Sequence, residues 1–319
     1  MAHVTFIHGI ANKPAPDVLL KTWRQALAHD DGLALGTKGI SSTMVYWADV
    51  LYEKPDKDQA SQESLEAAAA NRSLPPPVST EWKEDLSGKE KWWVEKFNAK
   101  LKLEELDNPQ LSVSEAAAGR DLERILLPWW IKRPMMEIFL RDVHHYLFNV
   151  EHSPRAGAKY RVQDEIRGRM LKALKEGSEK PGPHILVSHS MGTVIAYDCL
   201  KRVPDCPKID ALMTIGSPLG LDEIQEKMVP EWSRKEGFPA DRLRGAWVNV
   251  YDKLDPVAGL DPNISNDYQR QSKAVIEDLH EPNYGPWRHD INKYLGGSEL
   301  RKRLKVILGL QARGLPTSS

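Results

Sequence analysis

Short apolar runs rich in β-branched residues alternate with longer helical patterns along most of this chain, and the alternation limits its possible folds more than any other feature. Five runs predict buried strands and a weaker run predicts a sixth, at 4–7, 43–47, 184–187, 211–215, 246–251 and 274–276. Helical patterns fill the gaps, at about 16–29, 135–149, 160–176, 192–202 and 290–309. Strands that are joined by helices are typical of βαβ units, so we expect an α/β fold with a doubly wound, mainly parallel sheet.

One stretch, from about 53 to 130, breaks the alternation. It contains no convincing strand, but an alanine-rich polar helix, a proline break at 75–77 and helical patterns around 81–106 and 114–127. We therefore expect one domain over 1–319 that carries a helical insertion at 53–130. The insertion is rich in tryptophan, including Trp92, Trp93, Trp129 and Trp130. Tryptophan suits two roles equally well, so these side chains form either the core of the insertion or the aromatic wall of a cap over a pocket.

The charged residues nearly balance, with 44 lysines and arginines against 45 aspartates and glutamates and a net charge of −1. Such a chain has no electrostatic footprint for nucleic acid and no reason to bind an anionic membrane. The apolar run at the N-terminus is too short for a signal peptide, and no stretch approaches the ~20 apolar residues of a membrane span. We interpret Cys199 and Cys206 as reduced thiols and expect a cytoplasmic protein without membrane insertion. The sequence leaves the oligomeric state open.

The strongest chemical signal follows the third apolar run, where Val187 is succeeded by Ser188-His189-Ser190-Met191-Gly192 and a helical pattern. A sharp turn from a strand to a helix pushes the Oγ atom of Ser190 out of the sheet. The turn also places that hydroxyl at a helix N-terminus, where the backbone dipole favours negative charge. Small residues two positions to either side, Ser188 and Gly192, let the strand and the helix approach each other. The pattern therefore predicts a nucleophilic serine.

On these residues the chain resembles the α/β-hydrolase superfamily, in particular its lipase-like serine esterases, whose turn reads Gly-x-Ser-x-Gly. Ser188 departs from that pattern, and we expect its extra hydroxymethyl group to crowd the turn slightly. His8-Gly9-Ile10 closes the first run as the His-Gly turn does in the family. The resemblance implies that the backbone amides of Ile10 and Met191 form an oxyanion hole.

The resemblance extends to the segment after the fourth run, Gly216-Ser217-Pro218-Leu219, which looks like the lipase-type loop that borders the site. We therefore assign Ser217 and Leu219 to the wall of the substrate pocket. His189, which adjoins the nucleophile, is assigned to the same wall. The four tryptophans named above join them if the insertion forms a cap.

Two acids follow the fifth run, Asp252 and Asp255, and the family order of serine, acid and histidine requires one of them. The Asp-Pro-Val context of Asp255 resembles the acid loop of the family, so we predict Asp255 and interpret Asp252 as a solvated carboxylate that caps the next helix. The candidate bases are His280, at a strand end, and His289. His289 lies in a loop after the last strand, as the resemblance implies, and such a loop can reach back to Ser190, so we predict His289.

Motifs for other chemistry are missing from the sequence. No Gly-x-Gly-x-x-Gly follows a strand, no phosphate-binding loop occurs, and neither His-Glu-x-x-His nor a pair of cysteines with metal-site spacing is present. His144 and His145 are adjacent, so on a helix they point about 100° apart, which favours a helix-surface role over a shared metal ion. We therefore expect no cofactor and no metal.

These residues predict the hydrolysis of a carboxylic ester of a small molecule through an acyl-enzyme, with Ser190, Asp255 and His289 as the triad. Three alternatives stay open because a triad does not encode its substrate. The first keeps the chemistry and changes the bond: a thioesterase, an amidase, or a hydrolase of lactones such as macrocyclic natural products. The second is a lipase or phospholipase at a membrane surface. The third is a catalytically silent binding protein on a hydrolase fold.

Overall fold

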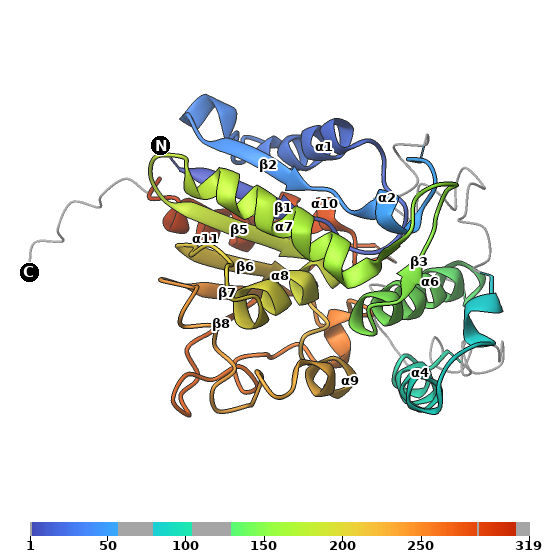
Figure 1. Ribbon diagram of the computed structural model, residues 1–319. Helices are drawn as coiled ribbons and strands as arrows, with labels where there is room; N and C mark the ends of the chain where they lie inside the picture. The colour runs from blue at the N-terminus through green and yellow to red at the C-terminus, as the bar shows by residue number, and fades with distance from the viewer. Residues whose placement is uncertain (1, 57–78, 104–128, 286, 311–319) are drawn as a thin grey trace, which may run out of the picture.

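Six parallel strands form the centre of the molecule in the computed structural model, which describes residues 2–56, 79–103, 129–285 and 287–310 (Figure 1). The strands are β1 (His3–Ile7), β2 (Ser41–Val45), β5 (His184–His189), β6 (Ala211–Ile215), β7 (Trp247–Tyr251) and β8 (Glu277–His280). They lie in the order β2-β1-β5-β6-β7-β8, and every neighbouring pair is parallel. The predicted α/β fold with a mainly parallel sheet is confirmed.

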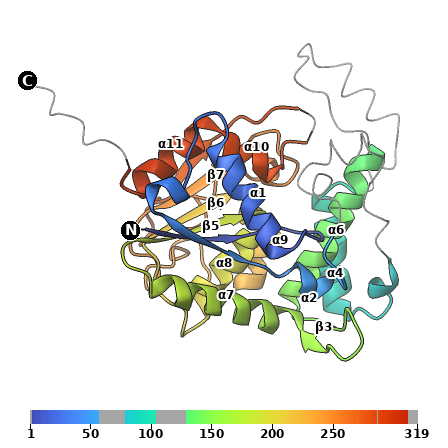
Figure 2. The ribbon, with the colours of Figure 1, turned by 90° about the horizontal axis from the view of Figure 1, so that it is seen from above.

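Helices cover both faces of this sheet, as Figure 2 shows from above. One face carries α1 (Pro16–Ala28), α10 (Ile291–Gly296) and α11 (Ser298–Ile307), and the other carries α7 (Val162–Ser178) and α8 (Met191–Arg202). Alternate strand residues belong to the two cores because successive side chains of a strand point to opposite faces. In β5, for example, Ile185 and Val187 are buried against the first set of helices and Leu186 against the second. The sheet is therefore doubly wound, as predicted.

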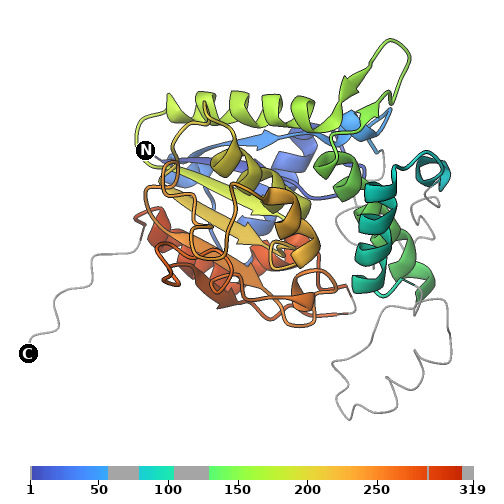
Figure 3. The same ribbon diagram turned by 60° about the horizontal axis from the view of Figure 1, so that its bottom comes forward.

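The remaining elements complete the fold outside the sheet and its covering helices. They are α2 (Ala48–Leu51), α4 (Gly88–Lys100), α6 (Trp129–Leu147), α9 (Asp222–Gln225), the 3₁₀ helices η1 (Gly36–Lys38), η2 (Glu81–Lys83), η4 (Glu226–Met228) and η5 (Ala258–Leu260), and the antiparallel pair of β3 (Glu151–His152) with β4 (Tyr160–Arg161). The helices α4 and α6 lie beyond the carboxyl ends of the strands (Figure 3). They pack against each other through Phe97 and Phe139, whose ring centroids are 5.7 Å apart.

The strand order changes direction at the carboxyl ends of β1 and β5. The chain goes from β1 to β2 on one side, and then crosses to β5 on the other side of β1. Loops diverge at such a switch point and leave a crevice, which is where open α/β sheets bind their ligands. Gly9 comes soon after β1 and Ser190 directly after β5, so both lie at this place.

The described part of the predicted insertion is helical. Within 53–130 the structure describes 53–56, 79–103 and 129–130, and none of these residues forms a strand. The alanine-rich helix near 67–70, the proline break and the helical pattern at 114–127 lie outside the described residues. The single domain with one continuous helical insertion therefore stays a prediction.

The prediction of the sixth strand at 274–276 is wrong. Strand β8 begins at Glu277, directly after this run, and it is the edge strand of the sheet. Its four residues are exposed or half-buried. Such an edge strand contains no apolar run that a periodicity argument can detect. The apolar run just before it, which ends at the buried Ile276, therefore leads the sequence pattern to place the strand too early.

The helix predicted at 290–309 is two helices, α10 and α11, which meet at Gly297. The reason is the side chain of Glu281, which accepts a hydrogen bond from the amide of Leu300 at 2.6 Å and so occupies the N-terminus of α11. A Cβ atom on residue 297 would overlap the Glu281 carboxyl group, so glycine leaves the space that this carboxyl occupies. A carboxylate from outside both helices thus separates them, which a local sequence pattern does not reveal.

The close contact between α8 and the end of β1 yields a stability prediction. A Cβ atom on Gly192 would lie 2.6 Å from the carbonyl oxygen of His8 and 2.8 Å from that of Ile7. Gly192→Ala should therefore lower the free energy of unfolding by about 1–3 kcal/mol, even though alanine gains about 1 kcal/mol in helix propensity. Urea unfolding followed by circular dichroism measures the change.

Gly168 in α7 is the matched control, because a Cβ atom there would meet no heavy atom within 4 Å. Gly168→Ala should keep the propensity gain and stabilise the protein by up to about 1 kcal/mol. Equal effects of the two substitutions would contradict the steric argument for Gly192.

Candidate active site

Ser190 is the one residue between the end of β5 and the first residue of α8. Its backbone has φ 54° and ψ −129°, a conformation that residues with a Cβ atom rarely adopt. The turn is held by a hydrogen bond from the amide of Ser190 to the carbonyl of Ile215 at 2.9 Å. A second bond, from the hydroxyl of Thr193 to the carbonyl of Ser190, measures 2.7 Å. This strained turn carries the serine side chain at the switch point of the sheet.

Small residues surround this turn. A Cβ atom on Gly9 would lie 2.6 Å from Ser190 Cβ, and Gly192 has the close contact with β1 described above. Ser188 stands where the esterase pattern has glycine, and its buried hydroxyl donates to the carbonyl of Met213 at 3.2 Å. The added hydroxymethyl group of Ser188 is thus hydrogen-bonded to the next strand, and the turn forms with this residue in place.

Ser190, His289 and Asp255 lie in one chain of hydrogen bonds. The Nε2 atom of His289 is 2.8 Å from the hydroxyl oxygen of Ser190, and its Nδ1 atom is 2.9 Å from Oδ1 and 2.8 Å from Oδ2 of Asp255. A carboxylate only accepts, so Nδ1 carries the hydrogen, and Nε2 has the lone pair that accepts from the serine hydroxyl. The structure brings together the three residues predicted as a triad, from the segments that follow three different strands, β5, β7 and β8.

The Asp255 carboxylate is buried and surrounded by hydrogen-bond donors. Besides His289, the amides of Val257 and Ala258 donate to Oδ1 at 2.7 and 3.0 Å, and the hydroxyl of Tyr294 donates to Oδ2 at 2.8 Å. Burial alone would raise the pKa of Asp255, but His289 and these donors together hold that pKa below its ordinary value. The acid therefore stays ionised beside His289.

Two further residues shape the position of the His289 ring. The Nε2–H group of His189 donates to the carbonyl oxygen of His289 at 3.1 Å, and the ring centroids are 4.9 Å apart. Burial first, and then His289 and Lys13, lower the pKa of His189 well below its ordinary value, so this side chain is neutral. Gly216 has φ 57°, and a Cβ atom there would lie 3.2 Å from the His289 ring. Glycine at this position leaves the space that the histidine occupies.

The alternative acid, Asp252, is not the solvated carboxylate that the sequence suggests. It is 1% exposed and accepts hydrogen bonds from the amides of Leu254 at 2.7 Å and Asn283 at 2.6 Å. Asp252 therefore fastens the loop that carries His289 to the end of β7, a contact between segments that are distant in the sequence. The alternative base, His280, is exposed on the edge strand β8.

The His8-Gly9-Ile10 turn is held by its own histidine. The Nδ1–H group of His8 donates to the carbonyl of Gly9 at 2.8 Å, and its Nε2 atom accepts from the amide of Trp47 at 3.0 Å. The Trp47 ring stacks on that of His8 with centroids 4.8 Å apart. A peptide group is planar and trans, so the amide of Ile10 points away from the Gly9 carbonyl and hence away from this bond. Ile10 lines the same pocket as Ser190, as an oxyanion donor must.

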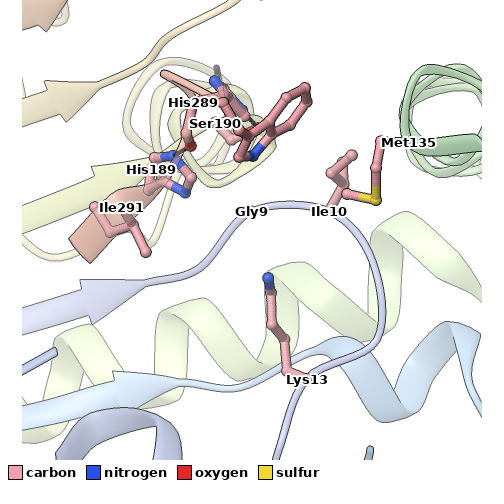
Figure 4. Close-up of a pocket in the computed structure, with 9 residues that line it drawn as sticks. Gly9, Ile10, Lys13, Met135, His189, Ser190, His289 and Ile291 are labelled. Carbon is pink, nitrogen blue, oxygen red and sulfur yellow. Dashed lines mark hydrogen bonds between the residues drawn. The ribbon is translucent and has the colours of Figure 1, made fainter. Parts of the chain in front are cut away.

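A pocket of about 320 Å³, which includes the open solvent at its mouth, lies at Ser190. Figure 4 shows Ser190 and His289 on one side of the Gly9–Ile10 segment, with Met135 reaching toward it from α6. The lining consists of Gly9, Ile10, Lys13, Met135, His189, Ser190, Trp287, His289 and Ile291. Of the predicted wall residues that the structure describes, this lining contains His189 but not Ser217, Leu219, Trp92 or Trp93.

Four lining residues were not predicted from the sequence: Lys13, Met135, Trp287 and Ile291. Trp287 and Ile291 lie two positions to either side of His289, and Lys13 lies three positions after Ile10, so all three are close in sequence to predicted site residues. Met135 has no such signal. It enters from α6, whose place beside Ser190 depends on tertiary packing.

Ser217 and Leu219 lie behind the turn at Ser190. The hydroxyl of Ser217 is 2.8 Å from that of Thr193, which in turn bonds the carbonyl of Ser190. Leu219 is fully buried, and its carbonyl accepts from the hydroxyl of Tyr268 at 2.8 Å. This loop therefore supports the turn at Ser190 from within the protein.

The tryptophans of the insertion have different environments. Trp93 is 2% exposed, and its indole N–H donates to the carbonyl of Glu223 in α9 at 2.8 Å, so this ring belongs to the core between α4 and α9. Trp92 is 58% exposed. Trp129 and Trp130 are the first residues of α6, and their side chains lie outside the described part of the structure.

His144 and His145 are buried in α6, so the predicted helix-surface role is wrong. The ring of Trp82, from η2, packs against both, with centroids 4.9 and 5.5 Å away. Burial lowers the pKa of His144 to about 4 and that of His145 to about 3. The covering residue comes from a separate segment, which explains why the helix pattern alone misplaced these side chains.

The described ranges contain neither a cluster of metal ligands nor a membrane-spanning helix. In them, no group of three or more histidines, cysteines, aspartates or glutamates could hold a metal ion. No helix among the same residues is both long and apolar enough to cross a bilayer. The expectation of no metal and no cofactor stays a prediction.

The buried His8 yields a prediction on pH. Burial first, and then the charge of Lys13, lower the pKa of His8 from 6.5 to about 3, so the folded protein holds it neutral. As the pH falls below 6.5, the unfolded chain binds a proton at this residue that the folded protein does not, and the free energy of unfolding decreases. Between pH 6 and pH 5 this residue should account for a loss of about 1 kcal/mol.

His8→Asn isolates this contribution, because asparagine can still donate to the Gly9 carbonyl and does not titrate. Urea unfolding at pH 7, 6 and 5 should give a smaller pH dependence for the variant than for the wild type. Parallel pH dependences would show that folding does not lower the pKa of His8.

No family model and no curated protein matches this sequence. Among solved structures, the chain is similar to acetyl xylan esterase 1 from Thermoanaerobacterium sp. JW/SL YS485, with 10% sequence identity and a TM-score of 0.32. The alignment covers 98% of this chain and 75% of that one. So distant a likeness carries no argument about the site.

Proposed function

We propose that this protein is a serine hydrolase that cleaves carboxylic esters of small molecules through an acyl-enzyme. The observation that carries the proposal is the buried chain of hydrogen bonds from Ser190 through His289 to Asp255. A serine in a strained turn, beside an imidazole nitrogen with a free lone pair and at the edge of a pocket, has the arrangement that activates a hydroxyl as a nucleophile.

In this mechanism the Ser190 oxygen attacks the ester carbonyl while its proton passes to Nε2 of His289. Asp255 stabilises the imidazolium that forms. The imidazolium gives the proton to the departing alcohol, and the acyl group stays on Ser190. A water molecule then repeats the sequence: His289 takes its proton, its oxygen attacks the acyl group, and the carboxylic acid leaves as Ser190 regains the hydrogen.

The negative oxygen that develops during the attack needs hydrogen-bond donors. We assign this role to the backbone amides of Ile10, in the turn after β1, and Met191, the first residue of α8. The N-terminus of the 12-residue helix α8 adds a favourable dipole. Loss of one such donor typically costs about 2.7–4 kcal/mol of transition-state stabilisation.

The pocket favours a small, partly apolar substrate. Met135, Trp287 and Ile291 supply apolar surface beside Ser190. The same chemistry would open a thioester, an amide or a lactone, so those alternatives differ from the proposal only in the substrate. A membrane-surface lipase and a silent binding protein remain the rivals, and the experiments below separate them.

The proposal includes a cytoplasmic setting, without nucleic acid as a partner and without membrane insertion. The balanced charge of the chain supports the absence of nucleic-acid binding. Cys199 and Cys206 are buried and unpaired, as is usual where thiols are kept reduced. Fractionation of the source cells tests this part of the proposal.

Ser190→Ala tests the nucleophile. It should leave the fold intact, abolish covalent labelling by a fluorophosphonate, and lower kcat for 4-nitrophenyl esters by ~10⁴-fold or more, because the members of a triad act as a unit. Nitrophenolate release from a panel of acetyl to palmitoyl esters measures the activity. Circular dichroism checks the fold.

Two histidine variants are the controls for this test. His289→Ala should lose labelling and turnover as Ser190→Ala does, while His280→Ala, on the exposed edge strand, should keep both. An unlabelled wild type would favour the silent binding protein, and labelling that survives in Ser190→Ala would contradict the nucleophile. Activity that rises sharply when long-chain esters form an interface would favour the membrane-surface lipase.

Met135→Ala tests the wall of the pocket. Removing this apolar side chain should change the ratio of kcat/KM between long-chain and acetyl esters by about 10-fold, because each methylene accommodated is worth ~1–3 kcal/mol. Trp92→Ala is the matched control, since this side chain is 58% exposed, and it should leave the ratio unchanged. A shift with Trp92→Ala and none with Met135→Ala would mean that the insertion tryptophan, and not α6, selects the substrate.

A further inference from the structure

Helix α6 reaches the site at two positions on one face. Met135 lines the Ser190 pocket, and Asp142 lies seven residues further along, about two turns away on the same side of a helix with ~3.6 residues per turn. Asp142 contacts the turn after β1, because the amide of Ala11 donates to its Oδ2 atom at 3.0 Å. A side chain of α6 thus touches the residue that directly follows Ile10, the proposed oxyanion donor.

Ala11 has a conformation that needs such support. Its φ is 70°, in the left-handed region that residues with a Cβ atom rarely adopt, and it is buried. A buried amide without an acceptor is costly, so the Asp142 carboxylate satisfies this group and holds the strained residue in place.

The Asp142 carboxylate is itself fully buried and has neighbours that compensate its charge. Arg141 donates to Oδ1 through Nε at 3.0 Å and through a terminal nitrogen at 2.7 Å, and the hydroxyl of Tyr52 donates to Oδ2 at 3.1 Å. Burial, followed by the charge of Asp142, raises the pKa of Tyr52 well above its ordinary value, so this hydroxyl stays a donor. Because desolvation offsets the attraction within a buried ion pair, stability alone is a weak reason to bury this charge.

We propose that Asp142 is a positioning residue that fixes the Ile10 amide in the orientation that binds the oxyanion, an inference that rests on the proposed esterase function. The peptide before Ile10 is held by the bond from His8 to the Gly9 carbonyl, and the peptide after it by the bond from Ala11 to Asp142. Peptide groups are planar, so holding both restricts rotation of the Ile10 amide. Donors that are fixed in advance need no reorganisation when negative charge develops.

This arrangement couples the pocket wall to the oxyanion site. Met135 and Asp142 belong to one continuous helix, and α6 packs against α4 of the predicted insertion. A shift of α6 that moves Met135 therefore also moves the carboxylate that holds Ala11. The docking of this helix completes the catalytic site as well as its wall.

Three variants of the full chain test the role of Asp142. Asp142→Leu keeps a branched side chain of similar size and removes the acceptor. Asp142→Asn keeps one carbonyl oxygen for the Ala11 amide and removes the charge that pairs with Arg141. Tyr52→Phe is the matched control, because it removes another hydrogen bond to the same carboxylate and leaves the Ala11 bond intact.

The readouts are kcat and KM for 4-nitrophenyl butyrate, with the melting temperature of each variant. We expect kcat of Asp142→Leu to fall about 10- to 100-fold while KM changes less than about 3-fold, since an oxyanion donor acts in the transition state. Asp142→Asn should recover most of the lost kcat. Tyr52→Phe should keep its kcat even where its melting temperature falls.

Two results would overturn the proposal. The first is a wild-type kcat in folded Asp142→Leu. The second is a loss of kcat in Tyr52→Phe as large as that in Asp142→Leu, which would mean that the bond to Ala11 has no special role. If Asp142→Leu does not fold, the double variant Arg141→Met/Asp142→Leu removes both buried charges and is judged by the same criteria. Failure of the proposed function gives a different result, because the wild type itself then neither turns over the ester nor reacts with a fluorophosphonate.

Discussion

The turn at Ser190 depends on a close approach between the segment that ends β1 and the segment that joins β5 to α8. Side chains at the points of contact would keep these segments apart. Gly9 and Gly192 stand at the two contacts, and a Cβ atom on either would lie about 2.6 Å from a neighbouring atom. At that separation the turn after β1 and the turn after β5 border one pocket. His289 and Ile10 both lie at this junction. The His289 ring contacts the Ser190 hydroxyl, and Ile10 lines the same pocket as Ser190.

The two carboxylates after β7 have separate roles, although they are close in sequence. Asp252 accepts the amide of Asn283 and so holds the loop that carries His289, while Asp255 accepts from the His289 ring itself. Both are buried, which is possible because each accepts several hydrogen bonds that replace those to water. One acid therefore places the histidine loop, and the other orients the ring.

The helices beyond the carboxyl ends of the strands contribute to the site through α6. Trp93 packs into the core against α9, and Trp92 is largely exposed, whereas Met135 lines the pocket and Asp142 holds Ala11. Helix α6, which continues beyond the predicted insertion, thus contacts the site through Met135 and through the buried carboxylate of Asp142. The buried tryptophan of the insertion, Trp93, instead joins α4 to α9.

Sequence patterns by themselves determined the parallel sheet and the positions of the residues that meet at the site. Both depend on features that are local in the sequence, namely apolar runs of strand length, a turn from strand to helix at Ser190, and loops that follow successive strands. Tertiary structure decided the rest. Exposed and half-buried residues form the edge strand β8, and Glu281 breaks the last helical pattern at Gly297. The bond between Asp142 and Ala11 joins residues 131 positions apart, and no local pattern records which helix face will dock against a turn so distant in the chain.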